Sequence, residues 1–297
     1  MIYLEELELP PESVETRFIR DEKRTCFGTM YPFNLFPLKL RNVRFAPITL
    51  FYGGNGSGKT TLLNIIAEKI DAIRHSEYNK SAFFEKYTDF CEVYGDSFPE
   101  NSQMLSSDDV FDYVMNMRYL NSNVDFHREE LFRGYGLHMQ RMVEDKSYVN
   151  LHGLEDYDRW KEAYDAQKVS RKKNTLSQFV KERLAKNVDM FSNGETALRY
   201  FTEHIDRDAI YLLDEPENSL SIKFQMDLAK YISDSARFYN CQFIISTHSP
   251  IFLSITDAKI YDLDSVPVKT KRWTELENVR QYYNFFKERE AEFEEER

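Results

Sequence analysis

The chain has 297 residues, of which 42% are hydrophobic, and its formal net charge is −11. This length and composition suffice for a large domain with a substantial core, and with 10 glycines and 9 prolines long low-complexity segments are not expected. The acidic balance argues against a protein that coats DNA nonspecifically, although it is compatible with a local basic patch.

The spacing of the cysteines and the lack of a long apolar run favour an intracellular protein. Cys26, Cys91 and Cys241 are far apart and follow no metal-binding spacing, so neither a zinc site nor a disulfide framework is expected. Residues 1–20 lack the pattern of a signal peptide, and no run of about 18 apolar residues occurs. We therefore expect a cytoplasmic protein with no membrane-spanning segment.

The N-terminal part is expected to be rich in β-strands. Residues 2–8, 17–19, 37–40 and 43–47 have the composition of short strands that would form a small antiparallel sheet. Two aromatic residues lie between the second and the third of these segments. Tyr31 or Phe33 is a candidate to stack on a purine base, although a place in the core or in a turn is the commoner role for either.

The segment Gly53–Thr60 matches the phosphate-loop pattern G-x-x-x-x-G-K-[ST] between an apolar strand, Ile48–Tyr52, and a helical pattern, Leu62–His75. Glycines let the loop curl so that its N–H groups face an anion. Lys59 is expected to contact the β- and γ-phosphates of ATP, and the Thr60 hydroxyl to bind Mg²⁺. The expected nucleotide-binding residues are Gly53, Gly54, Asn55, Gly56, Ser57, Gly58, Lys59, Thr60 and Thr61.

Residues 76–187 are aromatic, charged and mostly of helical period. Helices are expected around 111–117, with a start at Ser107 or Asp108, and then over 131–142 and 160–166. The segment Lys168–Lys186 holds seven basic residues and one acidic residue. It either contacts nucleic acid, such as DNA, or nucleotide phosphates, or it is a solvated helix face, which is the commoner role of such a charge run.

After Val188, buried strands alternate with helices, which predicts a parallel sheet with helices on its faces. The expected elements are the strands 209–213, 243–246 and 258–263, the helix 222–233 and a helical tail from Glu275.

Two of these strands end in residues able to act on a triphosphate. Asp214 follows the first and fits an Mg²⁺ ligand, and Glu215 fits the base that takes a proton from the attacking water. His248 follows the second and is expected to donate to the γ-phosphate. The ends of parallel strands meet at one sheet edge, so we expect these side chains to lie beside the phosphate loop.

Four motifs in order resemble the ATP-binding-cassette superfamily. As a set they look most like its soluble RecF-, OLD- and SMC-like ATPases, a group also called AAA family ATPases in the broad sense. They are GGNGSGKT (Gly53–Thr60), FSNGE (Phe191–Glu195), YLLDEPE (Tyr211–Glu217) and STHSP (Ser246–Pro250). FSNGE stands where that superfamily has its signature motif.

The resemblance implies an α/β P-loop NTPase fold of the ATP-binding-cassette type, with a mostly parallel sheet, an N-terminal antiparallel β-subdomain and a helical insert. It divides the chain into an N-terminal lobe (1–75), a mainly helical insert (76–187), the C-terminal part of the ATPase head (188–270) and a helical acidic tail (271–297).

Relatives of this type act as ATP-dependent dimers, in which each signature motif completes the site of the other subunit. The resemblance therefore implies that Ser192, Gly194 and Glu195 bind the nucleotide of a second copy, and that Gln103 is a candidate for the glutamine that contacts the metal. It also implies a separate effector protein, such as a nuclease or toxin, and a role in DNA repair or anti-phage defence.

Two other functions remain open. The chain could be the nucleotide-binding subunit of a membrane transporter, although FSNGE differs from the glutamine-containing signature of transporters. It could also be a binding module that uses ATP structurally, which the presence of Lys59, Asp214, Glu215 and His248 disfavours.

Overall fold

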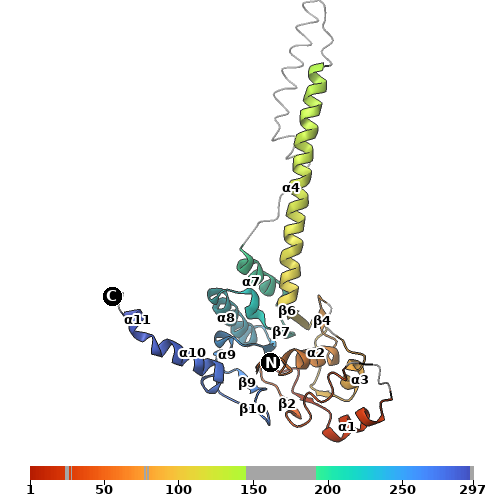
Figure 1. Ribbon diagram of the computed structural model, residues 1–297, viewed down its shortest axis with the longest axis vertical. Helices are drawn as coiled ribbons and strands as arrows, with labels where there is room; N and C mark the ends of the chain where they lie inside the picture. Colours follow the sequence, from red (N-terminus) through yellow and green to blue (C-terminus); the bar gives the residue numbers. More distant parts are fainter. Residues whose placement is uncertain (24–26, 28, 77, 79, 145–191, 295–297) are drawn as a thin grey trace, which may run out of the picture. The chain divides into compact units, whose positions relative to one another are not determined.

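A computed structural model describes the chain at residues 1–23, 27, 29–76, 78, 80–144 and 192–294. The chain divides into two compact units. The first consists of Met1–Tyr113 and Phe191–Arg297 and carries both sheets, and the second is Val114–Met190 (Figure 1). The helix α4 (Ser107–Glu144) begins in the first unit and supplies the described part of the second. Among the described residues, no helix has an apolar stretch long enough to cross a bilayer.

Within the described residues the larger sheet has seven strands in the order β10–β9–β3–β8–β7–β6–β4, all parallel except β10. Strands β3, β7 and β8 are apolar and buried along nearly their whole length, as expected for a parallel sheet covered on both faces. Their ends are in register, with Ser246 paired to both Phe51 and Asp214. The strands are β3 (Ile48–Tyr52), β4 (Ile73–Arg74), β6 (Gln103–Ser106), β7 (Ile210–Asp214), β8 (Gln242–Ser246), β9 (Lys259–Asp262) and β10 (Lys269–Thr270).

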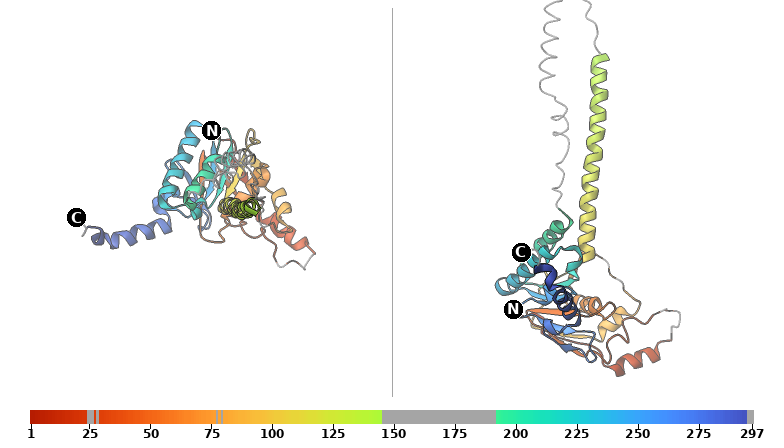
Figure 2. Two further views of the ribbon diagram at one scale, coloured as in Figure 1. Left: turned by 90° about the horizontal axis from the view of Figure 1, so that it is seen from above. Right: turned by 60° about the vertical axis from the view of Figure 1, so that its left-hand side comes forward.

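Helices cover both faces of this sheet (Figure 2). The helix α2 (Lys59–Lys69) follows the phosphate loop and packs against β7 and β8 on one side and against β5 and α3 on the other. It is therefore buried almost all round, which explains its run of apolar residues. The helices α7 (Asn193–His204) and α8 (Ile222–Phe238) pack against each other, and α8 contacts β8.

The N-terminal antiparallel subdomain is confirmed. Strand β1 (Glu6–Glu8) pairs with β2 (Asn42–Arg44) and with β5 (Glu92–Tyr94). The buried side chain of Gln242 in β8 ties this segment to the parallel sheet. It accepts from the backbone N–H groups of Tyr3 and Leu4 at 2.9 Å and donates to the Leu4 carbonyl at 2.8 Å. The two sheets therefore belong to one folded unit.

Two of the predicted N-terminal strands are wrong. Residues 17–19 lie in the helix α1 (Glu12–Asp21), where the Phe18 ring stacks on Phe33 with centroids 4.4 Å apart. Residues 37–40 form turns. The helix after the phosphate loop is also shorter than predicted, because it ends at Lys69 and is followed by β4.

The first part of the predicted insert, 76–187, belongs to the first unit. The helix α3 (Phe84–Asp89) and the strands β5 and β6 belong to the first unit, and β6 lies between β4 and β7 in the parallel sheet. The predicted helices 111–117 and 131–142 are both parts of α4, which begins at Ser107 as predicted. The predicted helix 160–166 and the basic segment Lys168–Lys186 lie outside the described residues.

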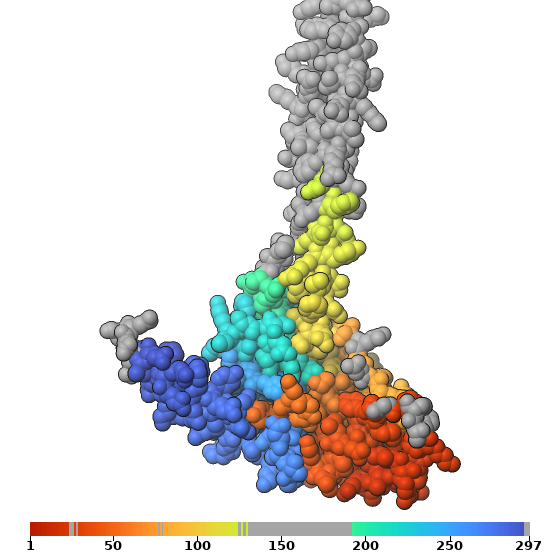
Figure 3. All heavy atoms as spheres, viewed as in Figure 1, coloured from red at the N-terminus to blue at the C-terminus, as the bar shows by residue number. Residues whose placement is uncertain are grey.

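The C-terminal part ends in a helical tail that reaches away from the rest of the first unit (Figure 3). The predicted strand 258–263 is β9, and the predicted tail helix begins at Glu277. The remaining elements are the 3-10 helices η1 (Pro216–Ser219) and η2 (Trp273–Glu275) and the helices α9 (Pro250–Leu253), α10 (Glu277–Glu288) and α11 (Glu290–Glu294).

Candidate active site

The phosphate loop joins β3 to α2. Gly56 and Gly58 have φ angles of 78° and 106°, which residues with a Cβ atom rarely adopt. At Gly58 a Cβ atom would also lie 2.6 Å from the ring of Phe36. The helix begins at Lys59, so its free N–H groups and positive dipole end face the loop. The local sequence thus forms the anion site that the glycine pattern predicts.

Lys59 is buried and connects the loop to the ends of the neighbouring strands. Its Nζ donates to the carbonyls of Gly53 and Gly54 at 3.0 and 3.3 Å. The same atom lies 2.7 Å from Nε2 of His248 and 3.4 Å from Oε1 of Glu215. The structure therefore brings together the three residues predicted as catalytic. We refer to Lys59, Glu215 and His248 as the catalytic cluster.

The catalytic cluster favours the ionised form of Glu215. The hydrogen bond to His248 is the main cause that lowers the Glu215 pKa to about 2, and Asn218 and the Lys59 charge act in the same direction. The distance from Glu215 Oε1 to His248 Nε2 is 3.3 Å. That nitrogen can accept from Lys59 or, when protonated, donate to Glu215, but it cannot do both at once. The histidine therefore has two alternative partners before any nucleotide binds.

Asp214 ends β7 and faces the start of α2. Its Oδ1 accepts from the Thr60 hydroxyl at 3.1 Å and from the hydroxyl of Ser246, the last residue of β8. Burial raises the pKa of Asp214, and these two hydrogen bonds oppose that shift.

Ser246 was not predicted as a site residue, although it opens the STHSP motif. Its hydroxyl also accepts from the N–H of Glu215 at 3.1 Å, so it positions two acidic residues.

The pair Thr60 and Asp214 suits a magnesium ion. Adjacent ligands of octahedral Mg²⁺, each about 2.1 Å from the metal, lie about 3.0 Å apart. The 3.1 Å between Thr60 Oγ1 and Asp214 Oδ1 is close to that separation, and both atoms are hard oxygen donors. No group of three or more His, Cys, Asp or Glu residues in the described part could hold a metal. Mg²⁺ commonly binds through one or two carboxylates plus phosphate oxygens and water, so this donor set fits it.

Glu215 adopts a left-handed backbone conformation, with φ 46° and ψ 54°. Residues with a side chain occupy this region at a cost of about 1–3 kcal/mol. Its N–H donates to the Ser246 carbonyl at 3.1 Å, which holds the turn against β8. The turn directs the carboxylate toward Lys59 and away from the strand direction of Asp214. The two neighbouring acidic residues thereby face different partners.

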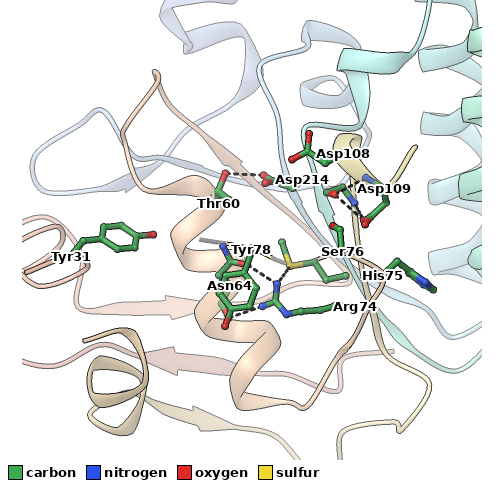
Figure 4. A pocket seen from close by; sticks show the side chains of 12 residues that line it. Tyr31, Thr60, Asn64, Arg74, His75, Ser76, Tyr78, Asp108, Asp109 and Asp214 are labelled. Atoms are coloured by element: carbon green, nitrogen blue, oxygen red, sulfur yellow. Dashed lines mark hydrogen bonds between the residues drawn. The ribbon is translucent and has the colours of Figure 1, made fainter. Parts of the chain in front are cut away.

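Two cavities meet at Thr60. One, of about 470 Å³, is lined by the phosphate loop, Tyr31 and Glu215. The other, of about 490 Å³, continues past Asp214 to Arg74 and to the acidic start of α4 (Figure 4). The first can hold the phosphates of a nucleotide against Lys59. Arg74 was not predicted because its side chain reaches the cavity from the short strand β4, which the sequence did not reveal.

The two aromatic candidates for base stacking differ in position. Tyr31 lines both cavities, and its hydroxyl is 2.7 Å from that of Thr61 in α2. Phe33 is buried and packs between Phe18 and Tyr87 in the N-terminal core. Only Tyr31 is therefore placed where it could contact a nucleotide.

The signature residues lie at the start of α7. Ser192 caps the helix by accepting from the Glu195 N–H at 3.3 Å, and the Glu195 carboxylate accepts from the Ser192 N–H at 2.9 Å. This capping box lowers the pKa of Glu195. Gly194 leaves room for the ring of Phe224, since a Cβ atom there would lie 2.9 Å from it. None of the described interactions joins these residues to the phosphate loop of the same chain.

The structure does not bring Gln103 to this site. Gln103 begins β6, whereas Ser106 at the other end of that strand pairs with Asp214. Three residues of a strand span roughly 10 Å. The Gln103 side chain instead lies 3.2 Å from His75 and 3.4 Å from the His204 carbonyl. Sequence distance from the phosphate loop could not reveal which end of the strand this glutamine occupies.

Comparison with protein families matches residues 178–253 to the AAA ATPase domain, which spans the signature segment, both acidic residues and His248. No curated protein matches this chain.

Several solved structures are similar in arrangement. One is the Smc head domain of Pyrococcus furiosus, which has an extended coiled coil and is bound to the C-terminal domain of ScpA. It is 14% identical in sequence, the comparison covers 97% of this chain and 99% of that chain, and the TM-score is 0.43. The SMC head domain of Thermotoga maritima is 13% identical, with 91% and 99% covered and a TM-score of 0.40. A dimeric ATP-binding cassette bound to ADP and phosphate is 15% identical, with 81% and 93% covered and a TM-score of 0.38. None of these distant likenesses identifies a partner of this chain.

The expected α/β fold, with a mostly parallel sheet and an antiparallel N-terminal subdomain, is confirmed by the strand order. The phosphate loop Gly53–Thr60 stands between a buried strand and a helix, as ATP binding requires. With the matched domain, these features confirm the predicted enzyme class: the chain carries a P-loop ATPase domain.

Proposed function

We propose that ATP binding drives two copies of this chain together, and that hydrolysis releases them. The observation that supports this most directly is the position of the signature residues. Ser192 is exposed at the start of α7, and no described interaction joins it to the phosphate loop of its own chain. A helix N-terminus attracts anions such as phosphate. In the dimer, this helix end faces the γ-phosphate bound at Lys59 of the second copy.

Each residue of the catalytic cluster has a role in this cycle. Lys59 and the loop N–H groups bind the β- and γ-phosphates, and Thr60 and Asp214 hold Mg²⁺, which would neutralise phosphate charge. Lys59 and His248 turn from Glu215 to the γ-phosphate when ATP binds. Glu215 then loses two of the groups that hold its pKa low, and it becomes basic enough to take a proton from the attacking water.

The dimer is the output of the cycle. We propose that it controls a separate effector protein, such as a nuclease or toxin, in DNA repair or defence against phage. The basic segment Lys168–Lys186 supports a contact with DNA by its charge alone. The protein acts in the cytoplasm under this proposal.

The dimer is tested with Ser192→Arg. The expected result, by light scattering with ATP and Mg²⁺, is a dimer for a hydrolysis-deficient Glu215→Gln chain and a monomer when Ser192→Arg is added. ATP affinity of the double variant should change by less than about threefold, since Ser192 does not contact the nucleotide of its own chain. Ser13→Arg is the matched control, because Ser13 is also an exposed serine in the first turn of a helix.

Two results would contradict the proposal. A Glu215→Gln chain that stays monomeric at saturating ATP would exclude the shared site. Loss of ATP binding in the Ser192→Arg chain would mean that the start of α7 acts within its own subunit.

A further inference from the structure

The loop that carries His248 is held by a carboxylate from η1. Oε1 of Glu217 accepts three hydrogen bonds: from the Thr247 hydroxyl at 2.7 Å, from the His248 N–H at 2.5 Å and from the Ser249 N–H at 3.1 Å. Hydrogen bonds from N–H groups to a carboxylate are shorter and stronger than neutral ones. Burial raises the pKa of Glu217, and these three donors oppose that shift.

The other side of the same loop is held by the C-terminal helix. Nδ2 of Asn278, in the first turn of α10, donates to the His248 carbonyl at 2.9 Å. The N–H of Asn278 donates to the Tyr52 hydroxyl at 3.3 Å, next to the phosphate loop. Leu276 and Val279 on either side are buried. The first turn of α10 is therefore fixed to the ATPase head.

These two contacts act on the two peptide planes that flank the His248 Cα atom. Glu217 fixes the plane that contains the His248 N–H, and Asn278 fixes the plane that contains its C=O. Because peptide units are planar, fixing both leaves the two backbone dihedrals of His248 little freedom. The direction of its Cα–Cβ bond is then set, and with it the region that Nε2 can reach.

We propose that Glu217 and Asn278 are positioning residues for His248, and that Asn278 couples the helix α10 to the ATPase centre. Neither residue touches the phosphate loop or the Mg²⁺ ligands in the described contacts. Their action on turnover therefore passes through the histidine. This inference rests on the role proposed above for His248.

Through this contact, a movement of α10 would change the position of His248 in the ATPase site. Beyond Val279 the helix exposes about half of the surface of its aromatic side chains, Tyr282, Tyr283 and Phe286 among them. A displacement of α10 would pull the Asn278 amide from the His248 carbonyl. A misplacement of about 1 Å in a catalytic constellation can lower a rate by about 100-fold.

The test uses Asn278→Asp in the full chain. Aspartate keeps the size of asparagine but replaces the donor by a negative charge that faces the His248 carbonyl. We expect kcat for ATP hydrolysis to fall at least about tenfold, with the Kd for ATP changed by less than about twofold. Asn278→Ala should lower kcat less. Gln281→Ala is the control, since Gln281 lies one turn further along α10 and its amide bonds only to Glu277 among the contacts described for it.

A double variant separates the positioning of His248 from effects of Asn278→Asp that do not involve His248. If Asn278 acts through His248, then His248→Ala combined with Asn278→Asp has the same kcat as His248→Ala alone, because interacting residues are not additive. The acceptor Glu217 is tested by two single variants: Glu217→Gln keeps an oxygen acceptor and should retain more activity than Glu217→Ala. Thermal unfolding of each variant checks that the chain is folded.

The outcomes distinguish the two proposals. If His248→Ala hydrolyses ATP at the wild-type rate, the proposed role of His248 is wrong. If His248→Ala lowers kcat while Asn278→Asp and Glu217→Ala do not, the positioning role is wrong. Multiplied losses in the double variant would also overturn it.

Discussion

Glu215→Gln is the variant that separates the chemistry of the catalytic cluster from its contribution to folding. Glutamine keeps the size of the side chain and an oxygen that can accept from His248, but it removes the negative charge beside Lys59. The variant should bind ATP as tightly as wild type or more tightly, because a negative charge leaves the phosphate pocket. Hydrolysis should fall about 10²- to 10⁴-fold, the usual contribution of a general base.

The same change should destabilise the nucleotide-free protein. A pKa lowered from 4.5 to about 2 corresponds to a maximum of about 3.4 kcal/mol, at 1.36 kcal/mol per pH unit. The Glu215 side chain is 28% exposed, so solvent screens its interaction with Lys59 and His248. We therefore expect a loss of about 1–2 kcal/mol in the free energy of unfolding at pH 7.

The sign of the pH dependence follows from the direction of the shift. Because the Glu215 pKa is lower in the folded than in the unfolded chain, its ionised form stabilises the protein above about pH 4.5. That stabilisation is lost as the pH falls toward 2. The difference between wild type and Glu215→Gln should therefore be constant from pH 7 to 5 and shrink below pH 4.5.

Urea unfolding without nucleotide, followed at several pH values, measures this difference, and phosphate release measures turnover. Glu100→Gln is the control, since Glu100 is exposed and distant in sequence from the site. Equal stability of Glu215→Gln and wild type at pH 7 would refute the energetic role of the cluster. Turnover within tenfold of wild type would refute the role of Glu215 as the base.

Two further predictions concern the phosphate loop. Thr60→Ala should weaken ATP binding at least about tenfold, or about 1.4 kcal/mol, with Mg²⁺ present. Fluorescent-nucleotide titration should show no such loss without Mg²⁺, and an equal loss would contradict the metal role. Gly58→Ala should cost about 2–5 kcal/mol by urea unfolding, from backbone strain and from contact with the Phe36 ring, whereas Gly56→Ala has open space and should cost only the strain, about 1 kcal/mol. Similar losses for the two glycines would contradict this.

The proximity of Lys59, Glu215 and His248 could be predicted because each residue lies in a strong local pattern. Lys59 lies in a loop whose glycines stand between an apolar strand and a helix, and Asp214 and His248 follow apolar runs of strand length. Parallel strands bring such ends to one edge, so proximity follows from the fold class alone. The proximity of these residues could be predicted without knowing the order of β3, β8 and β7 in the sheet.

The failures share a physical cause. Residues 17–19 have a strand-like composition, yet the packing of Phe18 on Phe33 favours a helix there. The resemblance makes Gln103 a candidate metal contact, but the register of β6 with β7 puts Gln103 at the far end of the strand. The contact of Asn278 with His248 joins a helix to a loop and has no periodic signal. Each of these depends on tertiary packing, which local patterns do not encode.

The strand order has a consequence for synthesis of the chain. The strand β3 lies between β8 and β9, which are translated about 190 and 210 residues later. At a synthesis rate of about 5–20 residues per second, both edges of β3 stay unpaired for roughly 10–40 s before β8 is translated. The first motif of the ATPase to be translated is therefore among the last to be completed. A nascent chain should become able to bind ATP only after its C-terminal strands have emerged.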